Sequence, residues 1–206
     1  MGKSSLVKNT YNQIAQAYTD RYGDSPFLLD QIEKLSKMLP SRAKVLDLGC
    51  GSGRASQHLL DKELSVTGID FSQEMLKLAE KRVPGVNFQK MDMRKLTFPD
   101  GAFDGVWTSF SLIHIPRKEI KQVLGECRRV LKNNGVIFVS TSLGEEKEGL
   151  EDEWLKKGLK MFFYRMSQKG LQNHLQSAHF KIEEIAVKRD ALENEDTPIL
   201  YAFARK

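Results

Sequence analysis

Between residue 44 and about residue 139, short apolar runs of strand length alternate with segments that have helical periodicity. The runs occupy residues 44–48, 65–69, 86–89, 103–108 and 135–141. Such an alternation is typical of βαβ units, in which helices cover both faces of a mostly parallel sheet. The sequence therefore predicts an α/β fold with a doubly wound, mostly parallel sheet.

Capping and turn residues separate these segments. Ser72 is a favourable N-cap for the helix that follows the second strand. Another helix is predicted over residues 117–131. The turn after it is predicted at residues 133–135, Asn-Asn-Gly, because asparagine and glycine tolerate positive φ.

The segments on both sides of this alternation have other patterns. Residues 5–38 have the periodicity of two amphipathic helices, with Pro26 near the start of the second. Residues 143–165 form an insertion with an acidic patch and an aromatic run, and insertions of this kind often carry specificity. Ser167 is predicted to cap a helix that ends near Ser177. Closing strands are predicted over residues 180–187 and 198–204.

The composition is that of an ordinary soluble globular protein, with 40% hydrophobic and 29% charged residues. At 206 residues the chain fits one large domain, because single cores commonly run to about 200 residues. It has no apolar run of about 18 residues and no secretory signal pattern at its N-terminus. We therefore expect a cytoplasmic protein without membrane insertion.

The charge distribution and the positions of cysteine and histidine residues indicate which partners are not expected. The net charge is +5, but the basic residues are scattered among acidic ones, so nucleic acid is not expected as a partner. Cys50 and Cys127 lie far apart, which gives neither a metal spacing nor a disulfide framework. His58, His174 and His179 show no ligand pattern either, and no metal is expected.

A glycine-rich loop directly follows the first predicted strand. Gly49, Gly51 and Gly53 allow the backbone to pass close beneath a ligand and to direct helix N-terminal amides at it. Asp47 ends the strand before the loop, and Asp70 ends the next strand. A carboxylate at the second position can accept hydrogen bonds from both hydroxyls of a ribose. Alternatively, the two acids only cap loop amides and a turn.

Two features distinguish between candidate nucleoside ligands. A nicotinamide dinucleotide site requires a third glycine where this chain has Arg54. Asp47 also disfavours a pyrophosphate, because a carboxylate beside phosphates would repel them. A ligand with a cationic amino-acid tail is therefore favoured.

Four stretches, residues 45–53, 68–75, 103–107 and 129–135, resemble class I S-adenosylmethionine-dependent methyltransferases. The resemblance is strongest to the small-molecule branch that includes ubiquinone and menaquinone biosynthesis methyltransferases. It implies S-adenosyl-L-methionine as cofactor, a seven-stranded Rossmann-like sheet whose last strand is antiparallel, and in-line methyl transfer to a small-molecule acceptor. It covers most of the chain and identifies the cofactor, but not the acceptor.

By position, the resemblance assigns the methionine end of the cofactor to Asp47 and the loop residues Gly49, Cys50, Gly51 and Gly53. It also implies that the N-terminal segment closes over the cofactor. Tyr11, Tyr18 and Tyr22 fall near one helix face, where they either contribute to this lid, with Tyr18 at the cofactor, or pack on the sheet.

The resemblance assigns the rest of the cofactor to residues after the other strands. Asp70 would bind the ribose and Phe71 would cover one face of the adenine. Asp92 would accept from the adenine amino group, and Met93 would supply a backbone amide. Ser109 would flank the amino-acid end.

His114 is the candidate general base for an acceptor that must lose a proton. It follows the fourth strand, on the side where doubly wound sheets bind ligands. The alternative is a histidine that bonds backbone near a helix start. Similarly, Trp154 and the aromatic run at 162–164 either wall an apolar or aromatic acceptor or belong to an amphipathic core helix.

Taken together, these patterns predict one methyltransferase domain over residues 1–206. It would comprise a helical lid (1–40), a cofactor-binding core (41–141), a substrate-side insertion (142–166), and a closing helix and strands (167–206). The chain departs from the family pattern at Asn133-Asn134, where proline-glycine is usual, and at His179, where glycine is common. A monomer or homodimer is expected. The alternatives are a non-catalytic cofactor-binding or regulatory module and a tRNA or protein methyltransferase.

Overall fold

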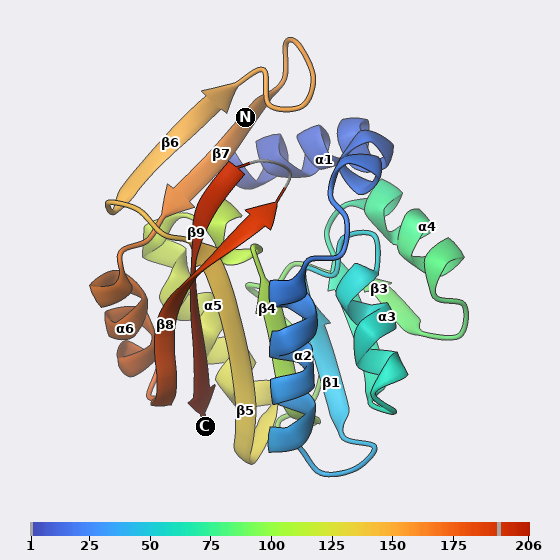
Figure 1. Ribbon diagram of the computed structural model, residues 1–206, viewed down its shortest axis with the longest axis vertical. Helices are drawn as coiled ribbons and strands as arrows, with labels where there is room; N and C mark the ends of the chain where they lie inside the picture. Colours follow the sequence, from blue (N-terminus) through green and yellow to red (C-terminus); the bar gives the residue numbers. More distant parts are fainter. Residues whose placement is uncertain (1, 193–194) are drawn as a thin grey trace.

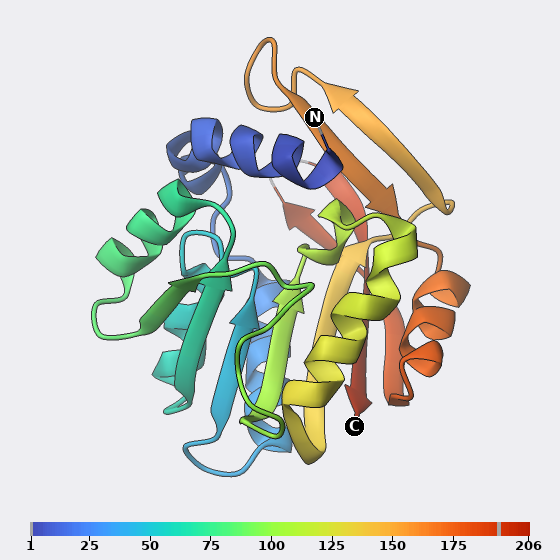
Figure 2. The same cartoon turned by 180° about the vertical axis from the view of Figure 1, so that it is seen from behind.

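The computed structural model describes residues 2–192 and 195–206. Its main sheet has seven strands in the order β3-β2-β1-β4-β5-β9-β8, with helices on both faces (Figures 1 and 2). The strands are β1 (Lys44–Leu48), β2 (Ser65–Asp70), β3 (Asn87–Lys90), β4 (Phe103–Ser109), β5 (Leu131–Ser142), β8 (Lys181–Leu192) and β9 (Glu195–Arg205). Neighbours from β3 to β5 are parallel, whereas β9 is antiparallel to both β5 and β8. The predicted doubly wound sheet with an antiparallel last strand is confirmed.

Two apolar layers hold the helices on the sheet. The helices are α1 (Lys3–Arg21), α2 (Pro26–Met38), α3 (Arg54–Asp61), α4 (Gln73–Arg82), α5 (Arg117–Val130) and α6 (Gln168–Ser177). Phe27 of α2 and Leu59 of α3 belong to the layer on one face, and Ile120 of α5 and Leu171 of α6 to the layer on the other. Within the described residues, no helix has the length and apolar character needed to cross a membrane.

The predicted N-caps form as local hydrogen bonds. The Ser72 hydroxyl accepts from the Met75 amide of α4 at 3.3 Å, and the Ser167 hydroxyl accepts from the Gly170 amide of α6 at 3.0 Å. Pro26 stands in the first turn of α2, where its missing N–H costs nothing. The two predicted N-terminal helices are therefore present.

Helix α1 and a two-stranded hairpin lie across the end of the main sheet where its parallel strands finish (Figure 2). The hairpin consists of β6 (Lys147–Asp152) and β7 (Lys160–Arg165). The Thr10 hydroxyl of α1 donates to the Lys160 carbonyl of β7 at 2.8 Å. Helix α1 and the hairpin, far apart in the sequence, thus lie together over the end of the sheet.

The hairpin corrects one alternative from the sequence, because the aromatic run is a strand and not an amphipathic core helix. Phe162 and Tyr164 point into the core and are fully buried, whereas Phe163 between them is only partly buried. This alternation is the two-residue period of a strand. Trp154 belongs to neither strand and lies in the loop that connects them.

Other boundaries differ from the sequence-based ones. The segment predicted as a turn at residues 133–135 is included in β5, which pairs with β4 through a register shift. Asn134 nevertheless has a φ of 63°, and His179, which also stands where glycine is common, has a φ of 62°. Both departures from the family pattern therefore occupy left-handed backbone, which asparagine and histidine adopt more readily than most residues. Strands β8 and β9 are longer than predicted.

Candidate active site

The glycine loop has the backbone that its composition indicates. Gly49, Gly51 and Gly53 have φ values of 78°, 53° and 77°, which side chains disfavour. A Cβ at Gly49 would also collide with the Ser111 hydroxyl. The amides of Gly49 and Cys50 bond the Ile69 carbonyl of β2 at 2.8 and 2.9 Å. The loop is therefore tied to the neighbouring strand.

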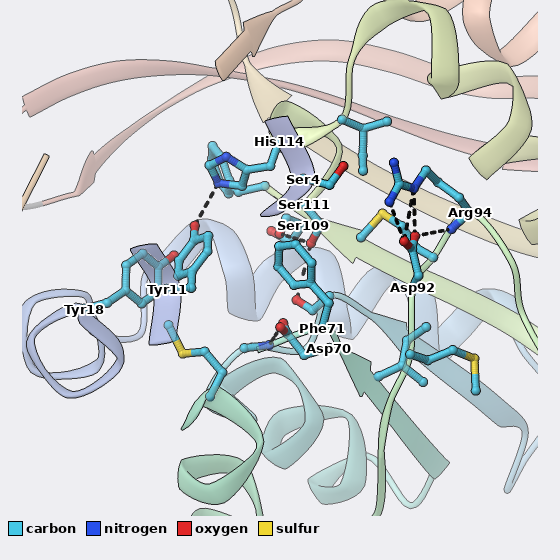
Figure 3. Close-up of a pocket in the computed structure, with 18 residues that line it drawn as sticks. Ser4, Tyr11, Tyr18, Asp70, Phe71, Asp92, Arg94, Ser109, Ser111 and His114 are labelled. Carbon is cyan, nitrogen blue, oxygen red and sulfur yellow. Dashed lines mark hydrogen bonds and ion pairs between the residues drawn. The ribbon is translucent and has the colours of Figure 1, made fainter. Parts of the chain in front are cut away.

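Asp70 ends β2 and fastens the same loop. One carboxylate oxygen accepts from the Gly51 amide at 3.0 Å, and the other accepts from the Ser72 amide at 2.8 Å. Burial raises the pKa of Asp70 to about 6, against the lowering effect of these bonds. Asp70 thus caps a turn and also lines a cavity, next to Phe71 (Figure 3). A carboxylate oxygen has room for a further donor beyond one amide.

Asp47 lies beneath the loop and is only 2% exposed. Its Oδ2 accepts from the Ser56 hydroxyl of α3 at 2.6 Å. Burial and, to a smaller extent, the nearby charge of Asp70 raise the pKa of Asp47 to about 7, against the lowering effect of the Ser56 bond. Two buried carboxylates with raised pKa values favour a positively charged ligand, because a cation would stabilise both ionised forms.

One cavity brings together the residues expected at the adenosine end. Phe71, Asp92 and Met93 line it with Asp70 and, from α1, Tyr18 (Figure 3). The remaining wall includes Ser4, Ile69, Met75, Met91 and Arg94. The arrangement is amphipathic, as a purine with a ribose requires.

Arg94 is a member of this site that the sequence analysis missed. Its Nε donates to the Asp92 carboxylate at 2.9 Å, and its Nη1 bonds Glu119 of α5 at 2.7 Å. The hydrogen bonds from Arg94 lower the pKa of Asp92. The spacing of the pair, two residues apart, was the only available signal. This spacing alone does not reveal the contact, because it depends on the loop after β3, which brings the two side chains together.

A second and larger cavity of about 570 Å³ adjoins the first. Asp47, Gly49, Cys50 and Ser109 line it at the sheet. Its opposite wall is a cluster of aromatic side chains, hereafter the aromatic wall: Tyr11, Tyr18, Trp154 and Phe163. Neighbouring rings of the wall have centroids 5.5–5.9 Å apart. The tyrosines of α1 thus face both cavities.

His114 connects the aromatic wall to the hairpin. It ends a short 3-10 helix, η1 (Leu112–His114), that precedes α5. Its Nδ1 lies 2.9 Å from the Phe162 carbonyl, and its Nε2 lies 2.8 Å from the Tyr11 hydroxyl (Figure 3). Burial lowers the pKa of His114 to about 4. A carbonyl only accepts, so Nδ1 carries the proton, and Nε2 of the neutral ring accepts from Tyr11.

The other polar candidates have local partners. The Ser109 and Ser140 hydroxyls are 2.8 Å apart, and His174 lies 3.0 Å from the Tyr164 hydroxyl. Burial raises the pKa of the Cys50 thiol well above its usual value, so this thiol stays protonated. In the part of the chain that the structure describes, no three His, Cys, Asp or Glu residues gather into a possible metal site.

Comparison with known proteins connects this geometry to a family. A model described as a methyltransferase domain matches residues 45–135. A demethylmenaquinone methyltransferase from Leptospira interrogans is 30% identical over 180 residues, which cover 80% of this chain and 69% of that protein. The chain belongs to the class I S-adenosylmethionine-dependent methyltransferases. The family uses S-adenosylmethionine as its cofactor, in agreement with the expectation from the glycine loop and the two acids.

Solved structures of methyltransferases share the fold. A SAM-dependent methyltransferase from Methanosarcina mazei superposes with a TM-score of 0.75 at 25% identity, covering 84% of this chain and 96% of that one. The 1,6-didemethyltoxoflavin-N1-methyltransferase of Burkholderia thailandensis, crystallised with S-adenosylhomocysteine, has a TM-score of 0.75 at 22% identity, over 99% and 86% of the two chains. The first curated relatives are longer, and the matches span 40–69% of their length.

Proposed function

We propose that this chain transfers a methyl group from S-adenosylmethionine to a small, flat, uncharged acceptor. The observation that carries the proposal is the position of the glycine loop and two buried carboxylates below adjoining cavities at the ends of the parallel strands. Ligands of doubly wound sheets bind at this end. The acceptor would enter the larger cavity, beneath α1 and the hairpin.

The side chains present fit the cofactor. Asp47 would hold the ammonium group above Gly49, Gly51 and Gly53, where side chains would obstruct the backbone. Asp70 would bind the ribose hydroxyls with the lone pairs that the Gly51 and Ser72 amides leave. Phe71 would cover the adenine, with Asp92 and Met93 at its edge.

The main tasks of the protein in this reaction are to align the two reactants and to exclude water. When bound, S-adenosylmethionine supplies a methyl group that its positively charged sulfur already activates. The protein must hold the nucleophilic atom of the acceptor in line and keep water out. Tyr11, Tyr18 and the hairpin cover the larger cavity and perform both tasks.

The hydrogen bonds of His114 suggest how a proton leaves the acceptor. Nε2 accepts from Tyr11, so His114 reaches the cavity through the Tyr11 oxygen. A hydroxyl acceptor would give its proton to that oxygen while Tyr11 gives its own proton to Nε2. The imidazolium would keep its Nδ1 bond to the Phe162 carbonyl. Burial lowers the pKa of His114 to about 4, so Nε2 is unprotonated at neutral pH, and the same shift makes the ring a weak base for this step.

The lining of the larger cavity supports an aromatic acceptor. The aromatic wall offers ring faces and edges that stack on a flat molecule. The charged pair on the hairpin side, Glu151 and Arg165, is bonded at 3.1 Å and adds no net charge. The name of the Leptospira relative, a demethylmenaquinone methyltransferase, agrees with a ring-shaped acceptor.

Two measurements test the proposal. Calorimetry should detect binding of S-adenosylhomocysteine but not of NAD, and NAD binding alone would exclude the proposal. Methyl transfer from labelled S-adenosylmethionine should then favour phenols and hydroquinones over alkyl amines and tRNA. Cofactor binding without transfer to any member of the panel would favour the non-catalytic module.

A further inference from the structure

One buried donor next to the cofactor site has no use in the reaction described above. Trp107 of β4 is 0% exposed, and its indole Nε1 has no hydrogen-bond partner among the described residues. An indole N–H is a donor only, and burying it unpaired is unfavourable because it loses its hydrogen bond to water. Gln31 Oε1, Thr108 Oγ1 and Thr141 Oγ1 are also unpaired, but Trp107 alone of these four residues lines the larger cavity.

The sheet places Trp107 beside Asp47. The two residues are register partners on the parallel strands β1 and β4. Partners on neighbouring strands point to the same face, with strands about 4.8 Å apart. The Trp107 ring stacks on Phe138 of β5, with centroids 4.1 Å apart, so its position is fixed by packing. The Asp47 carboxylate, which accepts hydrogen bonds, and the Trp107 indole, which donates one, therefore lie next to each other at the floor of one cavity.

The wall next to these two residues also favours an anion. The cavity reaches the start of α2, where Ser25, Phe27 and Leu28 line it, and this end of a helix carries positive potential. Arg54, at the start of α3, lines the same region, and its Nε lies 3.7 Å from the Asp24 Oδ1. A negative group placed here would meet the indole donor and the Ser25-capped start of α2, beside a guanidinium that it would share with Asp24.

We infer that Trp107 Nε1 donates to the carboxylate of the cofactor's amino-acid group while Asp47 binds its ammonium group. The inference rests on the proposed function and extends it to the recognition of the zwitterion. The ammonium and carboxylate of the cofactor are attached to the same carbon atom. They therefore match the Asp47 carboxylate and the Trp107 indole N–H, which lie on adjacent strands. Trp107 is thereby a binding residue that selects an intact amino-acid tail.

Binding of two ligands separates this role from packing. The probes are S-adenosylhomocysteine and 5′-S-(3-aminopropyl)-5′-thioadenosine, which keeps the ammonium but lacks the carboxylate. Trp107→Phe should lower the affinity for S-adenosylhomocysteine by roughly tenfold, which corresponds to the loss of a hydrogen bond to a charged group. It should leave the affinity for the decarboxylated analogue unchanged. Thr108→Val is the matched control, because it removes a neighbouring unpaired buried atom outside the cavity. It should change the affinity for neither ligand.

A second measurement uses the unaltered protein in case Trp107→Phe does not fold. The chain has 2 tryptophans, so a nitrogen-proton NMR spectrum shows two indole signals, assigned with Trp154→Phe. S-adenosylhomocysteine should shift the Trp107 signal downfield and slow its exchange with solvent, whereas the decarboxylated analogue should not.

The outcomes distinguish this inference from the proposed function. If the wild type does not bind S-adenosylhomocysteine, the proposed function itself fails. If it binds but Trp107→Phe weakens both ligands equally, or the indole signal responds equally to both, Trp107 does not contact the carboxylate.

Discussion

At the scale of single residues, the site is defined by partners that come from distant parts of the chain. Tyr11 and His114 are separated by 103 residues, yet their side chains share a hydrogen bond. Tyr11→Phe should lower kcat for a hydroxyl acceptor by about 100-fold, the usual contribution of general base catalysis, while the affinity for S-adenosylhomocysteine stays unchanged. His114→Ala should have the same two effects.

The double variant gives the matched comparison. If Tyr11 and His114 form one relay, combining the substitutions should cost no more than either alone, because groups that act as a unit are not additive. Multiplicative losses in steady-state assays would contradict the relay, and unchanged turnover in His114→Ala would end its catalytic role.

The two buried carboxylates should make cofactor affinity depend on pH. Burial raises the pKa of Asp47 to about 7 and that of Asp70 to about 6, so both are partly protonated in the free protein near neutrality. The ammonium of S-adenosylhomocysteine favours their ionised forms. The affinity for S-adenosylhomocysteine should therefore rise from pH 5.5 to 7.5, and binding should release protons. Calorimetry in two buffers of different ionisation enthalpy measures both the affinity and the number of protons released. In Asp47→Asn the affinity should be lower and the rise smaller.

The same shifts have a defined sign for stability. A folded pKa above the unfolded value of 3.8 means that the folded state holds protons longer than the unfolded chain. The contribution of each acid is most favourable below pH 3.8 and is lost as pH rises through 6 to 7. Asp47→Asn should therefore unfold at a higher temperature than the wild type at pH 8. A lower unfolding temperature would show that Asp47 is stabilised by a group of the protein.

At the scale of elements, one capping serine links α1 to α4. The Ser72 hydroxyl caps α4 and also donates to the Asn12 side chain of α1 at 2.7 Å. Ser72→Ala should lower the free energy of unfolding by about 1 kcal/mol for the lost cap. It should also speed amide hydrogen exchange in α1, because the helix loses a contact.

Ser167→Ala is the control for this effect, because the Ser167 hydroxyl caps α6 and donates to Glu146 instead of to a residue of α1. It should cost a similar free energy without changing exchange in α1. Equal acceleration of α1 exchange in both variants would mean that Ser72 acts only through global stability.

Elements also show what the sequence determines and what it does not. Strands β1, β2 and β4 follow from buried apolar runs, and the caps at Ser72 and Ser167 follow from local hydrogen bonding. The aromatic run of the hairpin was ambiguous, because a short apolar segment fits a strand or a helix until a pairing partner is known. Arg94 and Trp107 depend on loop geometry and on an unpaired atom, which periodicity does not reveal.

At the scale of the whole molecule, the two cavities have walls from α1, the end of the main sheet and the hairpin, which together should behave as one cooperative unit. Ligand binding to the folded state at 100 times Kd adds about 2.7 kcal/mol of stability. For a chain of this size, that energy should raise the unfolding temperature by roughly 5–10 °C in a single transition. Two transitions, of which S-adenosylhomocysteine shifts only one, would show that residues 1–40 or the hairpin unfold separately.

Hydrogen exchange locates the same effect within the molecule. S-adenosylhomocysteine should slow exchange at the loop of Gly49–Gly53, after β2 and β3, and along α1, because these segments line the cavities. Exchange in α6 should slow only by the amount that ligand binding suppresses global unfolding. Helix α6 packs on one face of the sheet and lines neither cavity. Protection confined to the loop, with α1 unchanged, would mean that α1 does not close over the cofactor.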